Sequence, residues 1–98
     1  PLWESLGDVA AVQDPDGWRL ATKLCRGREI LLWFDESRDK TMLRFEDGGE
    51  VEGVLEECPG FVFYLSAPDG SFLLCHNDHD FLIGAGEARE WVASLRKA

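Results

Sequence analysis

Residues 61–76, FVFYLSAPDGSFLLCH, contain a turn signal and two flanking apolar runs, and together they decide the fold class. Pro68 sets φ to about −65° at the second position of a turn, and Asp69 and Gly70 accept the remaining turn angles. The runs on both sides are rich in aromatic and branched side chains, which favour strands. The stretch therefore predicts a β-hairpin with strands near Phe61–Ser66 and Ser71–His76.

Similar turn signals recur at residues 14–17, 26–27, 36–39, 47–49 and 59–60. Such regular punctuation is typical of an antiparallel meander. The second Pro-Asp-Gly turn, at 15–17, is expected to close another hairpin. The segments between the turns predict further strands near Val9–Gln13, Trp18–Leu24, Ile30–Phe34, Met42–Glu46 and Phe81–Ile83.

The residue pattern predicts a secondary structure more clearly for segment 18–24 than for segment 50–57. In 18–24, apolar or uncharged residues at even positions alternate with Arg19, Ala21 and Lys23, which favours a strand with one wet face. Glu50–Glu57 fits both patterns, because Val51 and Leu55 belong to a helical stripe and to a strand alternation alike. We favour a strand or an irregular segment there.

The C-terminal residues have helical spacing. Ala88, Trp91, Val92 and Leu95 recur at i, i+3, i+4 and i+7, so a helix is expected to begin at about Glu87, after the flexible residues 84–86. Acids at 87 and 90 and bases at 96 and 97 suit the two ends of the helix dipole. A short helical turn at Leu2–Leu6, ended by Gly7, is also possible.

These elements predict one α+β domain over residues 1–98. It has an antiparallel β-meander of about five to seven strands packed against the C-terminal α-helix. The expected core joins side chains of that helix to side chains of the sheet. Its members are Leu31, Trp33, Phe61, Phe63, Leu73, Trp91, Val92 and Leu95.

The composition narrows the class of partner. Lys and Arg number 10 against 19 Asp and Glu, and the resulting net charge of −9 repels phosphate backbones and anionic lipids, so neither nucleic acid nor a membrane is an expected partner. The longest apolar runs, such as Ile30–Phe34, are far shorter than a membrane span. The three cysteines are an odd number and no secretion signal is visible, so we expect a reducing, cytoplasmic location.

One long span holds only acidic charges. Between Arg44 and Arg89 there is no Lys or Arg, although the chain before it holds seven. Such a span either solubilises the protein or steers a basic protein toward it. Trp33 and Asp35, at a strand end, are a second candidate contact, because large aromatics often serve as interface anchors. The expected partner-binding residues are Trp33, Asp35, Glu46, Asp47, Glu50, Glu52, Glu56, Glu57, Asp78 and Asp80.

Residues 75–80, CHNDHD, contain every common ligand type for a transition metal. A closed site would need a second cluster elsewhere in the sequence, and none is present, so we expect no metal and no cofactor. Asn77 and Asp78 are expected to satisfy backbone groups of a turn instead. Adjacent Cys75 and His76 point to opposite faces of a strand, which argues against a Cys–His nucleophile pair. No other catalytic signature stands out, so we expect no enzyme activity.

Residues 72–88, FLLCHNDHDFLIGAGEA, followed by Trp91, resemble segments of small bacterial immunity proteins, which neutralise a cognate toxin by binding it. The resemblance covers about a fifth of the chain. It implies a toxin inhibitor whose target is a basic, nuclease-type toxin.

The alternative is an adapter module. About seven strands followed by a helix with the sequence EAREWV (87–92) are similar in order to a pleckstrin-homology-like module. A lipid-binding member carries Lys and Arg in its first hairpin loop, where this chain has DPDG (14–17). That resemblance therefore implies protein interaction without lipid binding.

Overall fold

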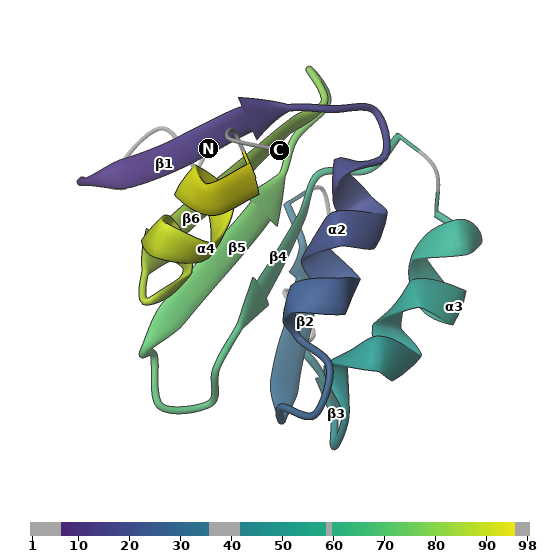
Figure 1. Ribbon diagram of the computed structural model, residues 1–98. Helices are drawn as coiled ribbons and strands as arrows, with labels where there is room; N and C mark the ends of the chain where they lie inside the picture. Colours follow the sequence, from purple (N-terminus) through teal and green to yellow (C-terminus); the bar gives the residue numbers. More distant parts are fainter. Residues whose placement is uncertain (1–6, 36–41, 59, 96–98) are drawn as a thin grey trace.

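Six antiparallel strands form the sheet of the computed structural model, which describes residues 7–35, 42–58 and 60–95 (Figure 1). Their order across the sheet is β1-β6-β5-β4-β2-β3. The predicted α+β class, an antiparallel sheet with a C-terminal helix, is confirmed. The strands are β1 (Val9–Gln13), β2 (Ile30–Phe34), β3 (Leu43–Phe45), β4 (Phe63–Ser66), β5 (Phe72–His76) and β6 (Phe81–Gly86).

Helices connect and cover these strands. The described helices are α2 (Gly17–Leu24), the 3-10 helix η1 (Gly48–Glu50), α3 (Val51–Glu56) and α4 (Ala88–Leu95). In Figure 1, α2 follows β1 and α3 lies beside α2, at the right. The C-terminal α4 packs against β1 and β6, on the same face of the sheet as α2 and α3 but at the β1 edge.

The segment 18–24 is helical, so the prediction of a strand there was wrong. Its residues Ala21, Thr22 and Cys25 are buried at spacings of one and four, which is a helical face rather than an alternation. The preceding DPDG sequence begins this helix instead of closing a hairpin. The backbone N–H of Gly17 donates to the carbonyl of Asp14, and the Asp14 carboxylate accepts from the N–H of Asp16.

The prediction of a strand or an irregular segment at Glu50–Glu57 was also wrong, because Val51–Glu56 forms α3. Val51 and Leu55 are buried one helical turn apart in α3, so burial of this helical stripe outweighs the poor helix propensity of Gly53 between them. By contrast, the 67–70 turn closes the predicted hairpin between β4 and β5. The N–H of Gly70 donates to the carbonyl of Ala67, and Gly70 has a φ of 76° that suits glycine.

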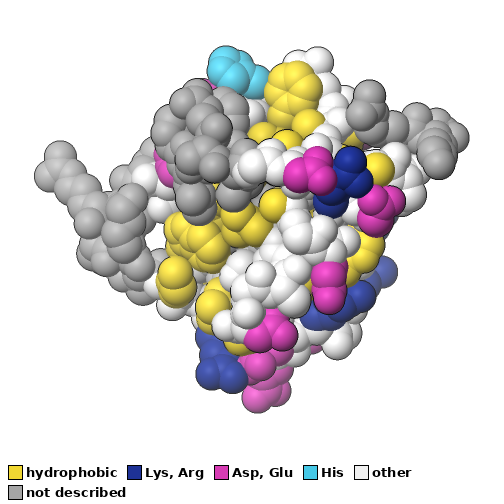
Figure 2. Space-filling view, turned by 90° about the vertical axis from the view of Figure 1, so that its left-hand side faces the viewer, with side chains coloured by type: hydrophobic (Ala, Val, Ile, Leu, Met, Phe, Trp, Pro, Cys, Tyr) yellow, Lys and Arg dark blue, Asp and Glu magenta, His cyan; other side chains and the backbone are white. Residues whose placement is uncertain are grey.

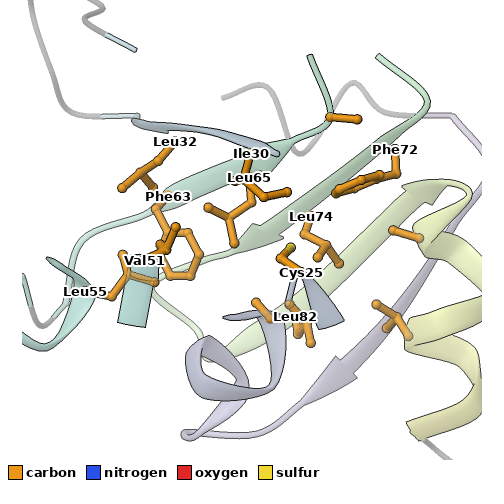
Figure 3. Packing of buried hydrophobic residues seen from close by; sticks show 14 of the residues in the cluster. Cys25, Ile30, Leu32, Val51, Leu55, Phe63, Leu65, Phe72, Leu74 and Leu82 are labelled. Atoms are coloured by element: carbon orange, nitrogen blue, oxygen red, sulfur yellow. The ribbon is translucent and has the colours of Figure 1, made fainter. Parts of the chain in front are cut away.

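The main core lies between the sheet and the helices (Figure 3). It joins Cys25 of α2's C-terminal end, Leu55 of α3 and Val92 of α4 to strand residues such as Leu74 and Leu82. Each of these side chains is at most 4% exposed. Amphipathic helices therefore stabilise one face of the sheet by burying apolar area.

A second, smaller apolar cluster lies on the opposite face of the sheet. It contains Tyr64, Cys75 and Ile83, and Trp33 and Leu73 pack against it. The prediction that Trp33 and Leu73 share one core with α4 was therefore wrong, since strand alternation sends them to the other face.

Of the remaining expected core residues, Phe63 and Val92 are buried, as predicted. Trp91, Leu95 and Leu31 are only half-buried, and Phe61 is 49% exposed. The expected turn at 36–39, the helical turn at Leu2–Leu6 and the bases at 96 and 97 lie outside the described residues.

Candidate functional site

A cavity of about 250 Å³ opens between α2, the C-terminal end of α3 and the turn that joins β5 to β6. We call it the α2–α3 cavity. Its apolar walls are the side chains of Trp18, Leu55, Phe61 and Phe63. Its polar lining consists of Glu56, His76, Asn77, Asp78 and Asp80, with Pro15, Cys58 and Gly60 completing it. The cavity thus brings together acids from two separate segments of the acidic span.

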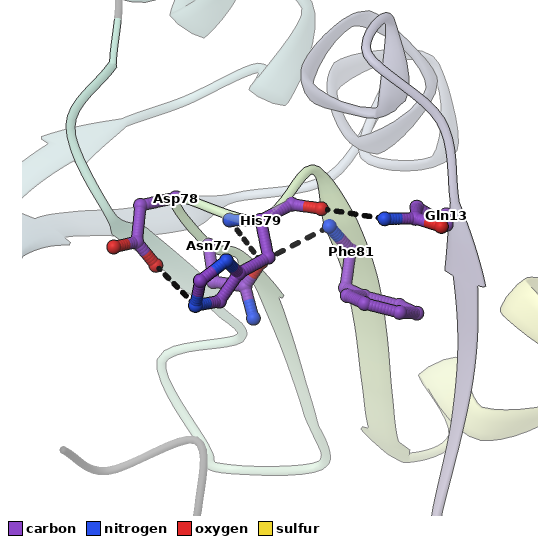
Figure 4. Close-up of polar contacts among 5 residues, drawn as sticks. All are labelled: Gln13, Asn77, Asp78, His79 and Phe81. Carbon is purple, nitrogen blue, oxygen red and sulfur yellow. Dashed lines mark hydrogen bonds and ion pairs between the residues drawn. The ribbon is translucent and has the colours of Figure 1, made fainter.

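The β5–β6 turn is built on Asn77, which is 3% exposed. Its side-chain oxygen accepts from the backbone N–H groups of His79 and Phe81, both at 3.0 Å (Figure 4). The Gln13 side chain of β1 donates to the His79 carbonyl. The local backbone role predicted for Asn77 is confirmed. Asp80 has a φ of 63°, a conformation that Asp and Asn tolerate better than most residues.

The predicted ligand cluster does not converge. Cys75 belongs to the cluster on the sheet face away from the helices, whereas His76 faces α2 and the cavity, as the strand alternation indicated. His79 lies on the outside of the turn, with Nε2 3.7 Å from the Asp78 carboxylate. Within the described ranges, no three His, Cys, Asp or Glu side chains are arranged to hold a metal ion.

His76 is the buried polar residue of the cavity, with 6% of its surface exposed. Its Nε2 lies 3.3 Å from the carbonyl oxygen of Asp14, so this nitrogen carries the proton and donates it. Gly17 permits this packing, because a Cβ at that position would lie 2.9 Å from the His76 ring. Burial lowers the His76 pKa below its ordinary value of 6.5, and the Asp14 carbonyl and the charges of Asp80 and Asp14 oppose this only partly.

The buried, neutral His76 is expected to make stability depend on pH. Unfolding returns the His76 pKa to about 6.5, so below that pH the unfolded chain binds a proton that the folded chain does not. The free energy of unfolding should therefore fall as the pH drops below about 6.5. Urea denaturation at pH values between 7 and 5 measures this slope.

The matched controls are His76→Gln and His79→Gln. The first should flatten the slope, and the second should retain it, because the His79 side chain is 68% exposed. The pKa values of Asp47 and Asp69 are lowered from 3.8, so these carboxylates become protonated, and change the stability, only at pH values below the range of the urea experiment. An unchanged slope in His76→Gln would contradict the assignment.

The three cysteines differ in burial. Cys25 and Cys75 are buried, and burial raises the pKa of each thiol to about 12. Cys58 is half-buried and lines the cavity. Because the thiolate is the reactive form, only Cys58 is expected to react with a thiol reagent in the folded protein.

Counting modified thiols by mass spectrometry before and after unfolding tests this expectation. The folded protein should take up one label rapidly and the unfolded protein three. Cys58→Ser should show no rapid labelling. Two thiols reacting equally fast in the folded protein would show that Cys25 or Cys75 is accessible.

The acids of the span extend from the end of β3 through η1 and α3, and Glu56 of α3 meets the acids of the β5–β6 turn at the cavity. Glu46, Glu50, Glu56, Glu57, Asp78 and Asp80 are exposed and Glu52 is half-buried. We call these seven residues the acidic region. In the part of the chain that the structure describes, none of them forms an ion pair with Lys or Arg. The described ion pairs of Arg44 and Arg89 involve acids elsewhere: Glu29, Asp8 and Glu90.

The opposite side has mixed charges. Figure 2 shows the side at the left of Figure 1, away from α3, and basic and acidic side chains lie next to each other there around a hydrophobic area. Among the described residues, Asp8 and Glu90 pair with Arg89, whereas the acids of the acidic region have no such partner.

Asp47 has a structural role that the sequence interpretation missed. Its carboxylate accepts from the backbone N–H groups of Gly27 at 2.9 Å and Gly49 at 2.8 Å. These two bonds, chiefly the one from Gly49, lower its pKa. Asp47 thus caps η1 and ties it to the loop after α2, and we leave it out of the acidic region.

Trp33 and Asp35 are not brought to the acidic region. Trp33 stacks on Tyr64 with ring centroids 5.3 Å apart, on the sheet face away from the helices. The Tyr64 hydroxyl donates to Asp35 at 2.9 Å. These residues therefore belong to the second apolar cluster and its edge, and a single partner surface does not unite them with α3.

Sequence reasoning missed the cavity because its walls come from distant segments. Trp18 lines it only because 17–24 is helical, and Phe61 was assigned to the core although it stands at the cavity wall. The helical stripe of 51–55 was the available signal for the α3 wall.

No known protein family, curated protein or solved structure matches this chain. Among the described helices, none is long and apolar enough to cross a bilayer.

Proposed function

We propose that this protein binds a basic protein through the acidic region and inhibits it, and that the target is a bacterial toxin met in the cytoplasm. The observation that carries the proposal is that the seven acids of the acidic region, from the end of β3 to the β5–β6 turn, have no Lys or Arg ion-pair partner in the described chain. Unpaired carboxylates produce a negative potential that attracts a basic surface.

An inhibitor must bind its target tightly, and the combination of the acidic region with the neighbouring α2–α3 cavity suits tight binding. A nanomolar complex requires about −12 kcal/mol, which scattered exposed charges do not supply by themselves. Steering by a charged surface can raise association rates by roughly 10- to 1,000-fold. A cavity with aromatic walls beside the acids adds a place where a partner side chain is anchored out of water. The acidic region and the α2–α3 cavity are contiguous, since Glu56, Asp78 and Asp80 belong to both.

The adapter alternative receives less support from the element order. A pleckstrin-homology-like order has its strands in succession before one terminal helix. Here α2 separates β1 from β2, and η1 and α3 separate β3 from β4.

The proposal is tested in cells with the product of the adjacent gene as the probe. Expression of that product alone should arrest growth, and co-expression of this protein should restore it through a stable complex that co-purifies. Growth arrest that persists in the presence of this protein, with no complex recovered, would overturn the inhibitor assignment.

A further inference from the structure

We propose that the α2–α3 cavity receives the guanidinium group of one arginine side chain of the partner. This inference rests on the proposed function and specifies which group of the basic partner is anchored. Four observations carry it: the size of the cavity, its aromatic walls, the acceptor that His76 leaves open to solvent and the carboxylates at its edge.

The cavity lies just below the usual size range of small-molecule sites. Its volume is about 250 Å³, whereas pockets for drug-sized molecules measure roughly 300–1,000 Å³. That volume suits a single side chain. The walls of Leu55, Phe61 and Phe63 would contact the aliphatic stem and the flat face of the guanidinium.

His76 supplies a hydrogen-bond acceptor in the lining. Its Nε2 donates to the Asp14 carbonyl, so in the neutral ring Nδ1 carries the lone pair. Among the described residues no group donates to Nδ1, and no fully buried side-chain nitrogen or oxygen lacks a hydrogen-bond partner, so Nδ1 is open to solvent. A ligand that displaces this solvent would have to bring an N–H or O–H donor to Nδ1.

The carboxylates at the edge of the cavity favour a donor that is positively charged. Glu56, Asp78 and Asp80 line the cavity, and none of them pairs with a Lys or Arg of the described chain. A cationic donor satisfies both the acids and the His76 acceptor. Guanidinium fits better than ammonium, because it is planar, is weakly hydrated and presents five N–H groups in several directions.

A neighbouring contact already shows this chemistry. The guanidinium carbon of Arg19 lies 4.8 Å from the centre of the Trp18 ring. Arg19 uses one face of that ring, and Trp18, Phe61 and Phe63 all line the cavity.

Nuclear magnetic resonance titration of the full chain with Nα-acetyl-L-arginine methylamide tests the proposal. We expect saturable shifts at ~millimolar concentration, as suits a ligand of this size. The shifts should centre on the Trp18 indole and the backbone amides of Asn77 and Asp78. The citrulline counterpart, which has nearly the same shape but no charge, should leave these resonances unchanged.

The variant Asp78→Asn/Asp80→Asn removes the two turn carboxylates. Asparagine tolerates the positive φ of residue 80, so the turn should survive. The affinity for the arginine probe should fall by about tenfold, as expected when two exposed ion pairs are lost. The matched control, Asp8→Asn/Glu87→Gln, removes two exposed acids outside the cavity and should bind as the wild type does.

Three results would overturn the inference: equal shifts with citrulline, tighter binding of the lysine counterpart, or no saturable shift at the cavity. These outcomes are separable from failure of the proposed function. If the arginine probe fails while the adjacent-gene product still binds, the cavity assignment alone is wrong. If the probe binds and that product does not, the inhibitor assignment alone is wrong.

Discussion

Replacing Gly84 with alanine is expected to lower the free energy of unfolding by about 3 kcal/mol, at the upper end of the usual cost of overpacking. A Cβ at this position would lie 2.4 Å from the carbonyl oxygen of Ala88 and 2.7 Å from Cγ2 of Val92. The nearest of these atoms belongs to the backbone of α4, so the clash is relieved only by moving the helix away from β6. Such a loss is a large part of the stability of a typical domain.

Gly53→Ala is the matched control. Gly53 lies within α3, and a Cβ there would meet nothing within 4 Å. The same chemical change should therefore raise the free energy of unfolding by about 0.5–1 kcal/mol, because alanine is the better helix former. Urea denaturation followed by tryptophan fluorescence measures both. If Gly84→Ala were as stable as Gly53→Ala, α4 could not pack on β6 as described.

Reversing the charge of Glu46, Glu50 and Glu52 to lysine is expected to weaken binding of the adjacent-gene product by about 100-fold or more, because like charges facing each other cost several kcal/mol. These side chains have no hydrogen-bond or ion-pair role in the described fold and do not line the cavity. Asp47 is left unchanged, because its carboxylate holds the N–H groups of Gly27 and Gly49.

The control reverses Asp8, Glu87 and Glu90, which are exposed and lie near the start of β1 and of α4. It changes the net charge by the same amount, and it too places lysine near the beginning of a helix. Isothermal titration calorimetry should give nearly wild-type affinity for the control. Equal weakening of both variants would show that net charge, rather than the acidic region, governs binding.

The periodicity of apolar residues in the sequence was sufficient to predict the type and the bounds of β1, β2 and α4, in which only one pattern fits. β1 and β2 have the predicted bounds, and α4 begins one residue after the expected start. Val92 is fully buried, and its partners at 88, 91 and 95 follow the helical stripe.

Periodicity failed where two patterns overlap in a short segment. In 18–24 every second residue is apolar or small, yet Ala21 and Cys25 are buried one helical turn apart. The neighbours that decide between the patterns are the sheet residues under α2, and the sequence does not identify them. Propensity gives way to such tertiary contacts.

Of the candidate site, only the negative charge could be predicted from the sequence. The run of acids without a base identified Glu50, Glu52 and Glu56 as candidate contacts, and the structure places them together on η1 and α3. The cavity beside them was beyond prediction, because it depends on how α2, α3 and the β5–β6 turn approach one another. Trp33 shows the converse error, since its strand position sends it to the other face of the sheet.

The association rate with the adjacent-gene product, measured at low and at high salt by stopped-flow fluorescence, tests the central claim most directly. If the acidic region steers a basic partner, the rate for the wild type and for the Asp8/Glu87/Glu90 control should fall steeply with salt. The Glu46/Glu50/Glu52 reversal should associate slowly at both salt concentrations. A reversal variant that associates as fast as the wild type, with the same salt dependence, would show that the acidic region does not bind the partner.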